Sequence, residues 1–370
     1  MSVSASLDSF FKITERGSTI ATEVRAGVAS FLTISYVILV NPQILSQCGI
    51  PSRDVVIGTC LASAVGTILT GVVGNLPFGL APGMGLSAYV TYGLVLGDVM
   101  SVRASLTACL VAGVLQGVFA VTGVSRVVMR VVPLSVKLAI VVGMGILVAM
   151  IGMVSVKLVV ANDKTIVGLG DLGDFNLQLA LAGLILIGTL VHHNVKGGIL
   201  IGMTLLTALV WSLNSSWPQQ VFEWPSMELG PEDLVDFSLL SDVEGLRTML
   251  PAIAAFVFIG ISDVSGVMFG LSALADLSER DGTIPGSLWA FLGSSLGTVL
   301  AALMGCSPII VTVECAAGIK EGGKTGLTAV TIGLLFLLSL FFAPLFGSVP
   351  QQATAPVLML VGAMMMSESK

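Results

Sequence analysis

The chain has 370 residues, of which 55% are hydrophobic and 10% are charged, and its formal net charge is −6. Because a soluble domain carries roughly 25% charged residues, this composition predicts an all-α protein that crosses a lipid bilayer many times. An acidic chain without a basic cluster does not suit nucleic acid as a partner, and the alternating segments typical of an outer-membrane barrel are absent from the sequence.

The N-terminal part of the chain contains a polar segment and four predicted spans. Residues 1–24 are mixed in polarity and are expected on the cytoplasmic side, because the loops assigned to that side carry more Lys and Arg. The spans that follow, in chain order, are residues 25–45, 52–73, 75–97 and 104–123.

The third of these spans, residues 75–97, is called the third crossing below, and it is predicted to be broken. Residues 75–85 contain two prolines and three glycines, which makes a continuous helix implausible. A half-length helix is expected to resume near Leu86.

The rest of the chain supplies further spans on both sides of an acidic segment, residues 214–246, which is expected outside the membrane. These spans are expected at residues 133–153, 177–191, 198–213, 249–274, 286–304, 305–323 and 327–346, with a last one beginning near Thr354. The sequence therefore predicts about twelve spans.

Residues 305–323, called the tenth crossing below, carry the second predicted break. Pro308 interrupts an apolar run, and the β-branched residues 309–313 favour an extended backbone. Glu314 follows at apparent membrane depth. An extended piece that ends at an acidic helix start is typical of a transporter binding site at the bilayer midplane; the alternative is an amphipathic surface loop.

The spacing of the two breaks indicates an internal repeat. If the third and tenth crossings are equivalent, the repeat contains seven spans, and an odd number of spans inverts the second copy. Two such copies need about fourteen spans, so the sequence predicts a chain that is cut short at its C-terminus; the alternative is a different architecture.

Asp263 and Glu314 are the acids expected well inside apolar spans. Placing a carboxylate at a helix centre costs about 2.5–3.5 kcal/mol on insertion scales, so a functional role is expected; the alternative is a protonated acid bonded between helices. Two acids and the amides of broken helices suit a neutral, N–H-rich solute coupled to H⁺. No other cofactor, no metal and no enzyme are expected: a P-loop and a nucleophile–base set are absent from the sequence, and His192 and His193 are expected at the interface.

Four stretches then resemble one family. Residues 80–89, LAPGMGLSAY, resemble the APGMGxNAYF signature of the AzgA-like adenine, guanine and hypoxanthine permeases within the wider xanthine/uracil permease group. The other similar stretches are residues 23–33 with Tyr36 and Asn41-Pro42, residues 313–326, and residues 341–344 leading to 353–356.

The resemblance implies a fold of two inverted seven-span repeats with a core and a gate domain. The core would comprise spans one to four and eight to eleven, the gate the remaining spans, and the protein would be a possible homodimer in the plasma membrane. The segments are then a cytoplasmic N-terminal segment 1–24, core 25–125, gate 126–213, acidic extracellular loop 214–246, core 247–346 and the truncated second gate half 347–370.

The resemblance also implies site residues. Asp263 and Glu314 would hold the purine and the coupling proton, Ser87 stands where the family has an asparagine, and Gly85 and Val313 would offer backbone groups. Gly260 departs from the family pattern, which has an acid there.

The function implied is import of adenine, guanine or hypoxanthine with H⁺, by an elevator-like displacement of the core against the gate. The alternatives are a permease for uracil, xanthine or another small solute, and a non-transporting, regulatory or fragmentary paralogue.

Overall fold

The computed structural model describes residues 3–125, 134–162, 165–193, 195, 197–215, 217–218, 220–241, 243–278 and 284–367. This part of the chain is mostly helical. Six stretches are long and apolar enough to cross a membrane by length and composition: Ile20–Cys48, Ser52–Val72, Val102–Thr122, Phe175–His192, Val243–Leu274 and Gly326–Gly347. Shorter apolar helices cover Met84–Val95, Val142–Ser155, Gly198–Asn214 and Ser287–Leu303.

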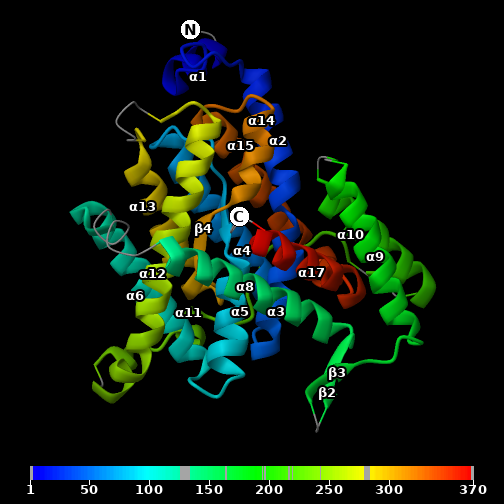
Figure 1. Cartoon of the computed structure of the whole chain (residues 1–370). Helices are drawn as coiled ribbons and strands as arrows, with labels where there is room; N and C mark the ends of the chain where they lie inside the picture. Colours follow the sequence, from blue (N-terminus) through cyan, green and yellow to red (C-terminus); the bar gives the residue numbers. More distant parts are fainter. Residues whose placement is uncertain are drawn as a thin grey trace. The chain divides into compact units, whose positions relative to one another are not determined.

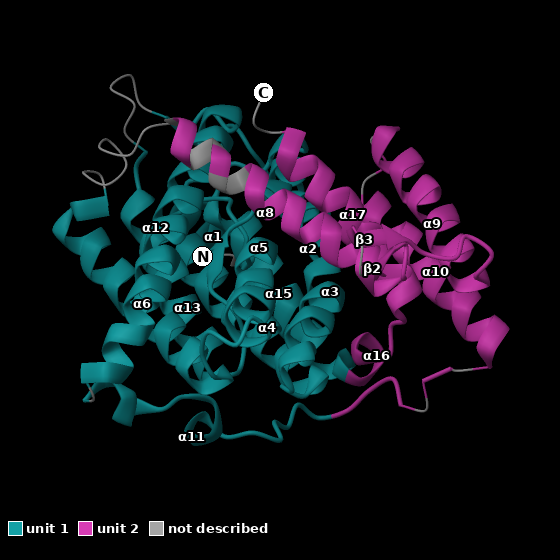
Figure 2. Cartoon of the chain, turned by 60° about the horizontal axis from the view of Figure 1, so that its bottom comes forward, with its two compact units in different colours: residues 1–132, 224–343 teal, residues 133–223, 344–370 magenta. Residues whose placement is uncertain are grey.

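The chain forms two compact units, each made of two separate parts of the sequence (Figure 2). Unit 1 contains Met1–Val132 and Trp224–Ala343, and unit 2 contains Pro133–Glu223 and Pro344–Lys370. The segment expected as one acidic loop is therefore divided between the units at residue 223.

Unit 1 contains most of the long helices and both strands of a small central sheet (Figure 1). Its first half contains α1 (Val3–Phe11), α2 (Ile20–Ile34), α3 (Tyr36–Leu45), η1 (Ser46–Cys48), α4 (Ser52–Val72), β1 (Leu80–Pro82), α5 (Met84–Ala88), the π-helix η2 (Tyr89–Val95) and α6 (Val102–Thr122). Its second half contains α11 (Pro231–Leu234), η3 (Phe237–Leu240), α12 (Val243–Leu274), α13 (Ser287–Leu303), β4 (Ile309–Val311), η4 (Val313–Cys315), α14 (Ala316–Lys320), α15 (Gly326–Ser339) and η5 (Leu340–Phe342).

Unit 2 is built from helices and one hairpin. Its elements are α8 (Leu134–Ser155), β2 (Val159–Asn162), β3 (Ile166–Leu169), α9 (Phe175–His192), α10 (Gly198–Asn214) and α17 (Gln351–Ser367), and α16 (Ala343–Gly347) begins at the boundary. Helix α17 packs against α8, α9 and α10, and Val156, Leu177 and Ala355 belong to the core of this unit.

Glycines let the helices of unit 1 approach closely. Helix α4 packs against α13 and α15. A Cβ at Gly293 would meet the carbonyl of Gly66, and a Cβ at Gly326 would collide with the carbonyl of Gly71. Small residues at such crossings are typical of helices packed in membranes.

Three elements differ from the expectations. Span one begins at Ile20, and its two parts α2 and α3 meet at Ser35, which keeps helical backbone angles. Helix α12 begins already at Val243. The polar loop expected after α8 contains the antiparallel hairpin β2–β3, because β-branched side chains in both strands favour extended backbone.

The N-terminal segment packs onto unit 1. Phe11 and Ile13 are buried against Leu327. The guanidinium of Arg16 donates to the carbonyls of Asn75 and Lys324, at 2.6 and 2.7 Å. The segment thus connects the start of the third crossing with the chain that follows the tenth.

A buried carboxylate fixes the start of α15. Glu23 is fully buried and accepts hydrogen bonds from the backbone N–H groups of Lys324 and Thr325, at 3.0 and 3.1 Å, and from the hydroxyl of Thr328 at 2.6 Å. These donors belong to the first turn of α15 and the residues before it, so Glu23 satisfies groups that a helix leaves open at its N-terminus.

Replacing Glu23 with glutamine is expected to lower the free energy of unfolding by about 3 kcal/mol, because the amide turns an NH₂ group toward donors that have lost their acceptor. Thermal unfolding of the purified protein in detergent measures this. The control is Glu15→Gln, since Glu15 pairs with Lys12 on the exposed surface and such pairs contribute little. An equal effect of both substitutions would contradict the assignment.

Candidate functional site

The two predicted breaks are both present, and they pair with each other. Strand β1 of the third crossing is antiparallel to β4 of the tenth crossing, with Leu80 opposite Val311 and Pro82 opposite Ile309. The pairing continues at both ends, through Gly83 N–H to the Pro308 carbonyl (3.2 Å) and Thr312 N–H to the Gly79 carbonyl (3.1 Å). Extended backbone thus lies inside unit 1, where protein rather than lipid surrounds it.

Hydroxyl groups from neighbouring helices complete the hydrogen bonds of these strands. Thr67 of α4 accepts from Leu80 N–H at 2.8 Å and lies 3.2 Å from the Leu80 carbonyl. Thr298 of α13 accepts from Ile309 N–H at 3.0 Å, and Ser294 donates to the Ile309 carbonyl at 2.5 Å. In each half, the helix before the broken crossing therefore supplies partners for its strand.

Thr67→Val is expected to lower the free energy of unfolding by about 1–3 kcal/mol, because a buried N–H loses its acceptor. Thr298→Val is expected to cost less, because the Ile309 carbonyl keeps its bond to Ser294. Thermal unfolding tests both. Thr331→Val is the control, since the hydroxyl of Thr331 bonds within its own helix, to Leu327; a cost equal to that of Thr67→Val would contradict the prediction.

Glu314 lies in η4, directly after strand β4. The hydroxyl of Tyr36 donates to its carboxylate at 2.7 Å, and the hydroxyl of Thr33 lies 3.1 Å from its carbonyl oxygen. Glu314 is partly exposed and the preceding Val313 is 41% exposed, whereas Thr312 and Cys315 are buried. Glu314 therefore lies next to an exposed residue, at a point where the tenth crossing is not fully buried.

Gly85 and Ser87 lie in α5 and are fully surrounded by protein. The hydroxyl of Ser87 lies 2.6 Å from Asn41 Oδ1 and 2.7 Å from Ser307 Oγ. The Asn41 amide also donates to Thr59 at 2.9 Å. Ser87 thus belongs to a buried polar cluster that joins α3, α4, α5 and the chain before β4.

The predicted site residues fall into two groups at opposite ends of the strand pair. Ser87 and Gly85 follow the end of β1 that pairs with Pro308, and Val313 and Glu314 follow the end of β4 that pairs with Gly79. The three paired residues between these ends span about 10 Å.

Asp263 is contributed by α12, which packs against β4, η4 and α14. Its side chain is partly exposed. The structure therefore brings the helix that carries Asp263 to the tenth crossing, and both acids belong to unit 1.

The departure at Gly260 has a structural counterpart. The amide of Gln116, a buried side chain of α6, lies against the Cα of Gly260 and donates to the Phe256 carbonyl at 3.1 Å. A side chain at position 260 would meet this amide. Gln116 therefore occupies space that a larger residue at position 260 would need.

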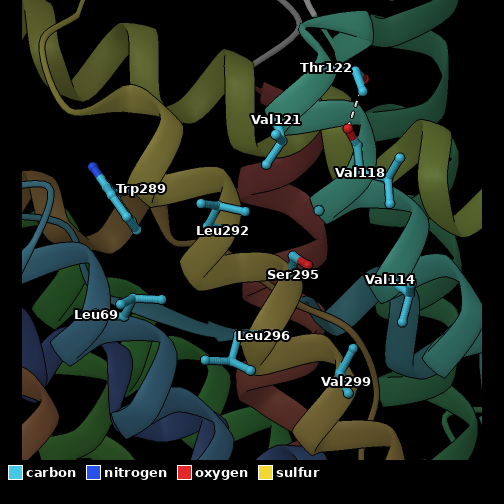
Figure 3. Close-up of a pocket in the computed structure, with 11 residues that line it drawn as sticks. Leu69, Val114, Val118, Val121, Thr122, Trp289, Leu292, Ser295, Leu296 and Val299 are labelled. Carbon is cyan, nitrogen blue, oxygen red and sulfur yellow. Dashed lines mark hydrogen bonds between the residues drawn. The ribbon is translucent and has the colours of Figure 1, made fainter.

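A pocket elsewhere in unit 1 has different chemistry (Figure 3). It has a volume of about 580 Å³ and lies between α4, α6 and α13. Its two hydroxyl groups are already bonded, Thr122 to the Val118 carbonyl and Ser295 to the Gly113 carbonyl, both at 2.8 Å. The remaining lining is apolar, so the pocket suits hydrocarbon and not a polar solute.

Sequence reasoning did not assign roles to Tyr36, Thr33, Thr67 or Thr298. Hydroxyl residues inside apolar spans are the available signal, because a buried hydroxyl needs a partner. A hydroxyl inside an apolar span shows that a hydrogen-bond partner exists, but it does not show which residue that partner is.

A helical membrane chain with two broken crossings paired at their strands, and with acids beside them, has the organisation of a secondary transporter. Residues 21–369 match the family model of the xanthine/uracil permeases, which is described as a permease family. The chain belongs to this family, which confirms the resemblance seen in the sequence, and it is a multi-pass membrane transporter and not an enzyme.

Curated relatives agree over nearly the whole chain. A putative permease of Methanocaldococcus jannaschii is 37% identical, with 98% of this chain and 83% of the relative covered. The guanine/hypoxanthine permease GhxP of Escherichia coli O157:H7 is also 37% identical (98% and 81% covered). The adenine permease AdeP of Escherichia coli K12 is 32% identical (98% and 80% covered).

Solved structures show the fold. The transmembrane domain of the cyanobacterial bicarbonate transporter BicA has a TM-score of 0.70 at 17% identity, with 94% of this chain and 89% of that chain covered. Murine Solute Carrier 26 family member A9 has a TM-score of 0.62 at 10% identity (94% and 61% covered). At these identities the likeness concerns the arrangement of helices and not the substrate.

Proposed function

We propose that the protein imports purine nucleobases, namely adenine, guanine or hypoxanthine, as a secondary active transporter. The relatives named for these bases support this substrate class. The observation that carries the proposal is the carboxylate of Glu314, which is bonded to Tyr36 beside the paired strands of the two broken crossings. A carboxylate accepts hydrogen bonds from the N–H groups that all three bases carry.

In this proposal the base contacts Glu314 and Asp263 through its N–H groups, and a backbone group of Val313 completes the site. Gly85 lies buried in α5 at the other end of the strand pair and is not among these contacts. Ser87, at that same end, fixes the position of α5, because its hydroxyl already bonds within the buried cluster. The two acids also take up the coupling proton, since a carboxylate in a site closed from water can exchange a proton during the cycle.

The larger architecture extends the same proposal. Unit 1 is the core and unit 2 belongs to the gate, and transport displaces one against the other. The matching hydroxyl support of β1 and β4 favours an inverted repeat. A plasma-membrane location, a cytoplasmic N-terminus and a homodimer complete the proposal. These three features rest on the loop charges and on the resemblance.

Uptake of labelled guanine, hypoxanthine, adenine, xanthine and uracil tests the function, in a host without its own base permeases and at two external pH values. We expect purine uptake that is stimulated by external acid, abolished by a protonophore and blocked by unlabelled purine. Uptake of uracil instead would contradict the purine class, and uptake of xanthine instead would contradict the choice of adenine, guanine and hypoxanthine within that class. Absence of all uptake, with the chain shown in the membrane, would contradict transport of these bases.

A further inference from the structure

The carboxylate of Glu314 is held by a side chain that lies far away in the sequence. Tyr36 is 2% exposed, and its hydroxyl donates to Glu314 Oε1 at 2.7 Å. A hydrogen bond from a donor that is itself buried and fixed keeps its acceptor oxygen close to one direction. The bond therefore restrains the direction in which this carboxylate presents its oxygens.

Two more hydroxyls of the first span approach the same segment. Ser30 donates to the Cys315 carbonyl at 3.3 Å, and Thr33 lies 3.1 Å from the Glu314 carbonyl while also approaching carbonyls of its own helix. Residues 30, 33 and 36 recur at intervals of three, which places them on one side of a helical segment. Ser35 between α2 and α3 keeps helical backbone angles, so this side continues from Ser30 to Tyr36.

A close helix contact supports this arrangement. Helix α14 follows Glu314 and packs against α2. A Cβ at Gly318 would meet both the Ala26 carbonyl and the Ser30 hydroxyl. The absence of a side chain at Gly318 lets the two helices approach, and this approach brings the hydroxyls of the first span to η4.

We propose that Tyr36 is a positioning residue for the substrate, acting through Glu314, with Ser30 and Thr33 fixing the backbone of the same segment. This inference rests on the proposed function of Glu314 and extends it to the first span. In Tyr36→Phe the ring remains and only the donor is lost, so the carboxylate rotates more freely and binds the base less well.

Uptake kinetics of guanine, normalised to the amount of protein in the membrane, test the role. Tyr36→Phe is expected to raise KM by about tenfold, with the maximal rate per transporter changed less than about twofold. The matched control is Tyr92→Phe, at a partly exposed tyrosine of η2, and it is expected to leave KM unchanged because the donor to Glu314 is Tyr36. An unchanged KM in Tyr36→Phe overturns the proposal, and so does an equal rise in both variants.

A double-mutant cycle tests whether Tyr36 changes KM through Glu314. Glu314→Asp shortens the carboxylate side chain and moves it away from Tyr36, so adding Tyr36→Phe to that variant is expected to change KM by less than about threefold. The same tenfold effect in both backgrounds overturns the proposal. If uptake is too slow to measure, guanine binding to the purified variants can be measured as thermal stabilisation. The effect of Tyr36→Phe is then compared between the parent and the Glu314→Asp variant.

Different outcomes refute the proposed function and the role of Tyr36. Glu314→Gln with normal KM and normal rate refutes the site in the proposed function. A raised KM in Glu314→Gln, together with an unchanged KM in Tyr36→Phe, refutes only the role of Tyr36.

Discussion

Replacing Glu314 with glutamine is expected to lower the rate of guanine uptake on the order of a hundredfold, which corresponds to about 2.7 kcal/mol. The amide keeps the size of the side chain, but one acceptor oxygen becomes an NH₂ donor that faces the N–H groups of the base. The amide also cannot carry a proton. Initial uptake rates, normalised to protein in the membrane, measure the effect.

The control for this experiment is Glu228→Gln. Glu228 is exposed in the acidic segment before α11, and its backbone N–H bonds to Asp54 at 2.9 Å. Its substitution is expected to leave uptake unchanged. A normal rate in Glu314→Gln, or an equal loss in both variants, would contradict the site.

Replacing Gly318 with valine is expected to abolish most of the folded protein. A Cβ at this position would meet the backbone carbonyl of Ala26, which cannot move without displacing α2. Overpacking of this kind typically costs about 1–3 kcal/mol or more, and here it also separates Tyr36 from Glu314. The yield of monodisperse protein and its thermal unfolding temperature measure the effect.

Gly188→Ala is the matched control for this substitution. Gly188 lies within α9, and a Cβ there would have no neighbour within 4 Å. Alanine in a helix is favoured over glycine by about 1 kcal/mol, so this variant is expected to be as stable as the parent or more so. Normal yield and stability of Gly318→Val would show that α2 and α14 do not need their close contact.

The sequence indicated both broken crossings because the causes are local. Proline and glycine interrupt the third crossing, and Pro308 with the β-branched residues after it favours extended backbone in the tenth. The pairing of these strands is a tertiary contact. The sequence contains no pattern from which their register could be read.

Other features were missed for the same kind of reason. Ser87 was expected near the substrate from its motif, whereas its buried bonds to Asn41 and Ser307 depend on segments distant in the sequence. Acids in apolar spans could be recognised individually, but the hydroxyls that hold them could not be matched to them.

The hydroxyl support of the two strands has a consequence for the energetics of closing the site. The N–H groups of Leu80 and Ile309 bond to threonine hydroxyls of α4 and α13 and do not depend on solvent. When water leaves such a site, these groups lose no partner, and no desolvation penalty of the strand backbone opposes the change. The free-energy difference between the hydrated site and the site without water can then be set by the substrate and the acidic side chains.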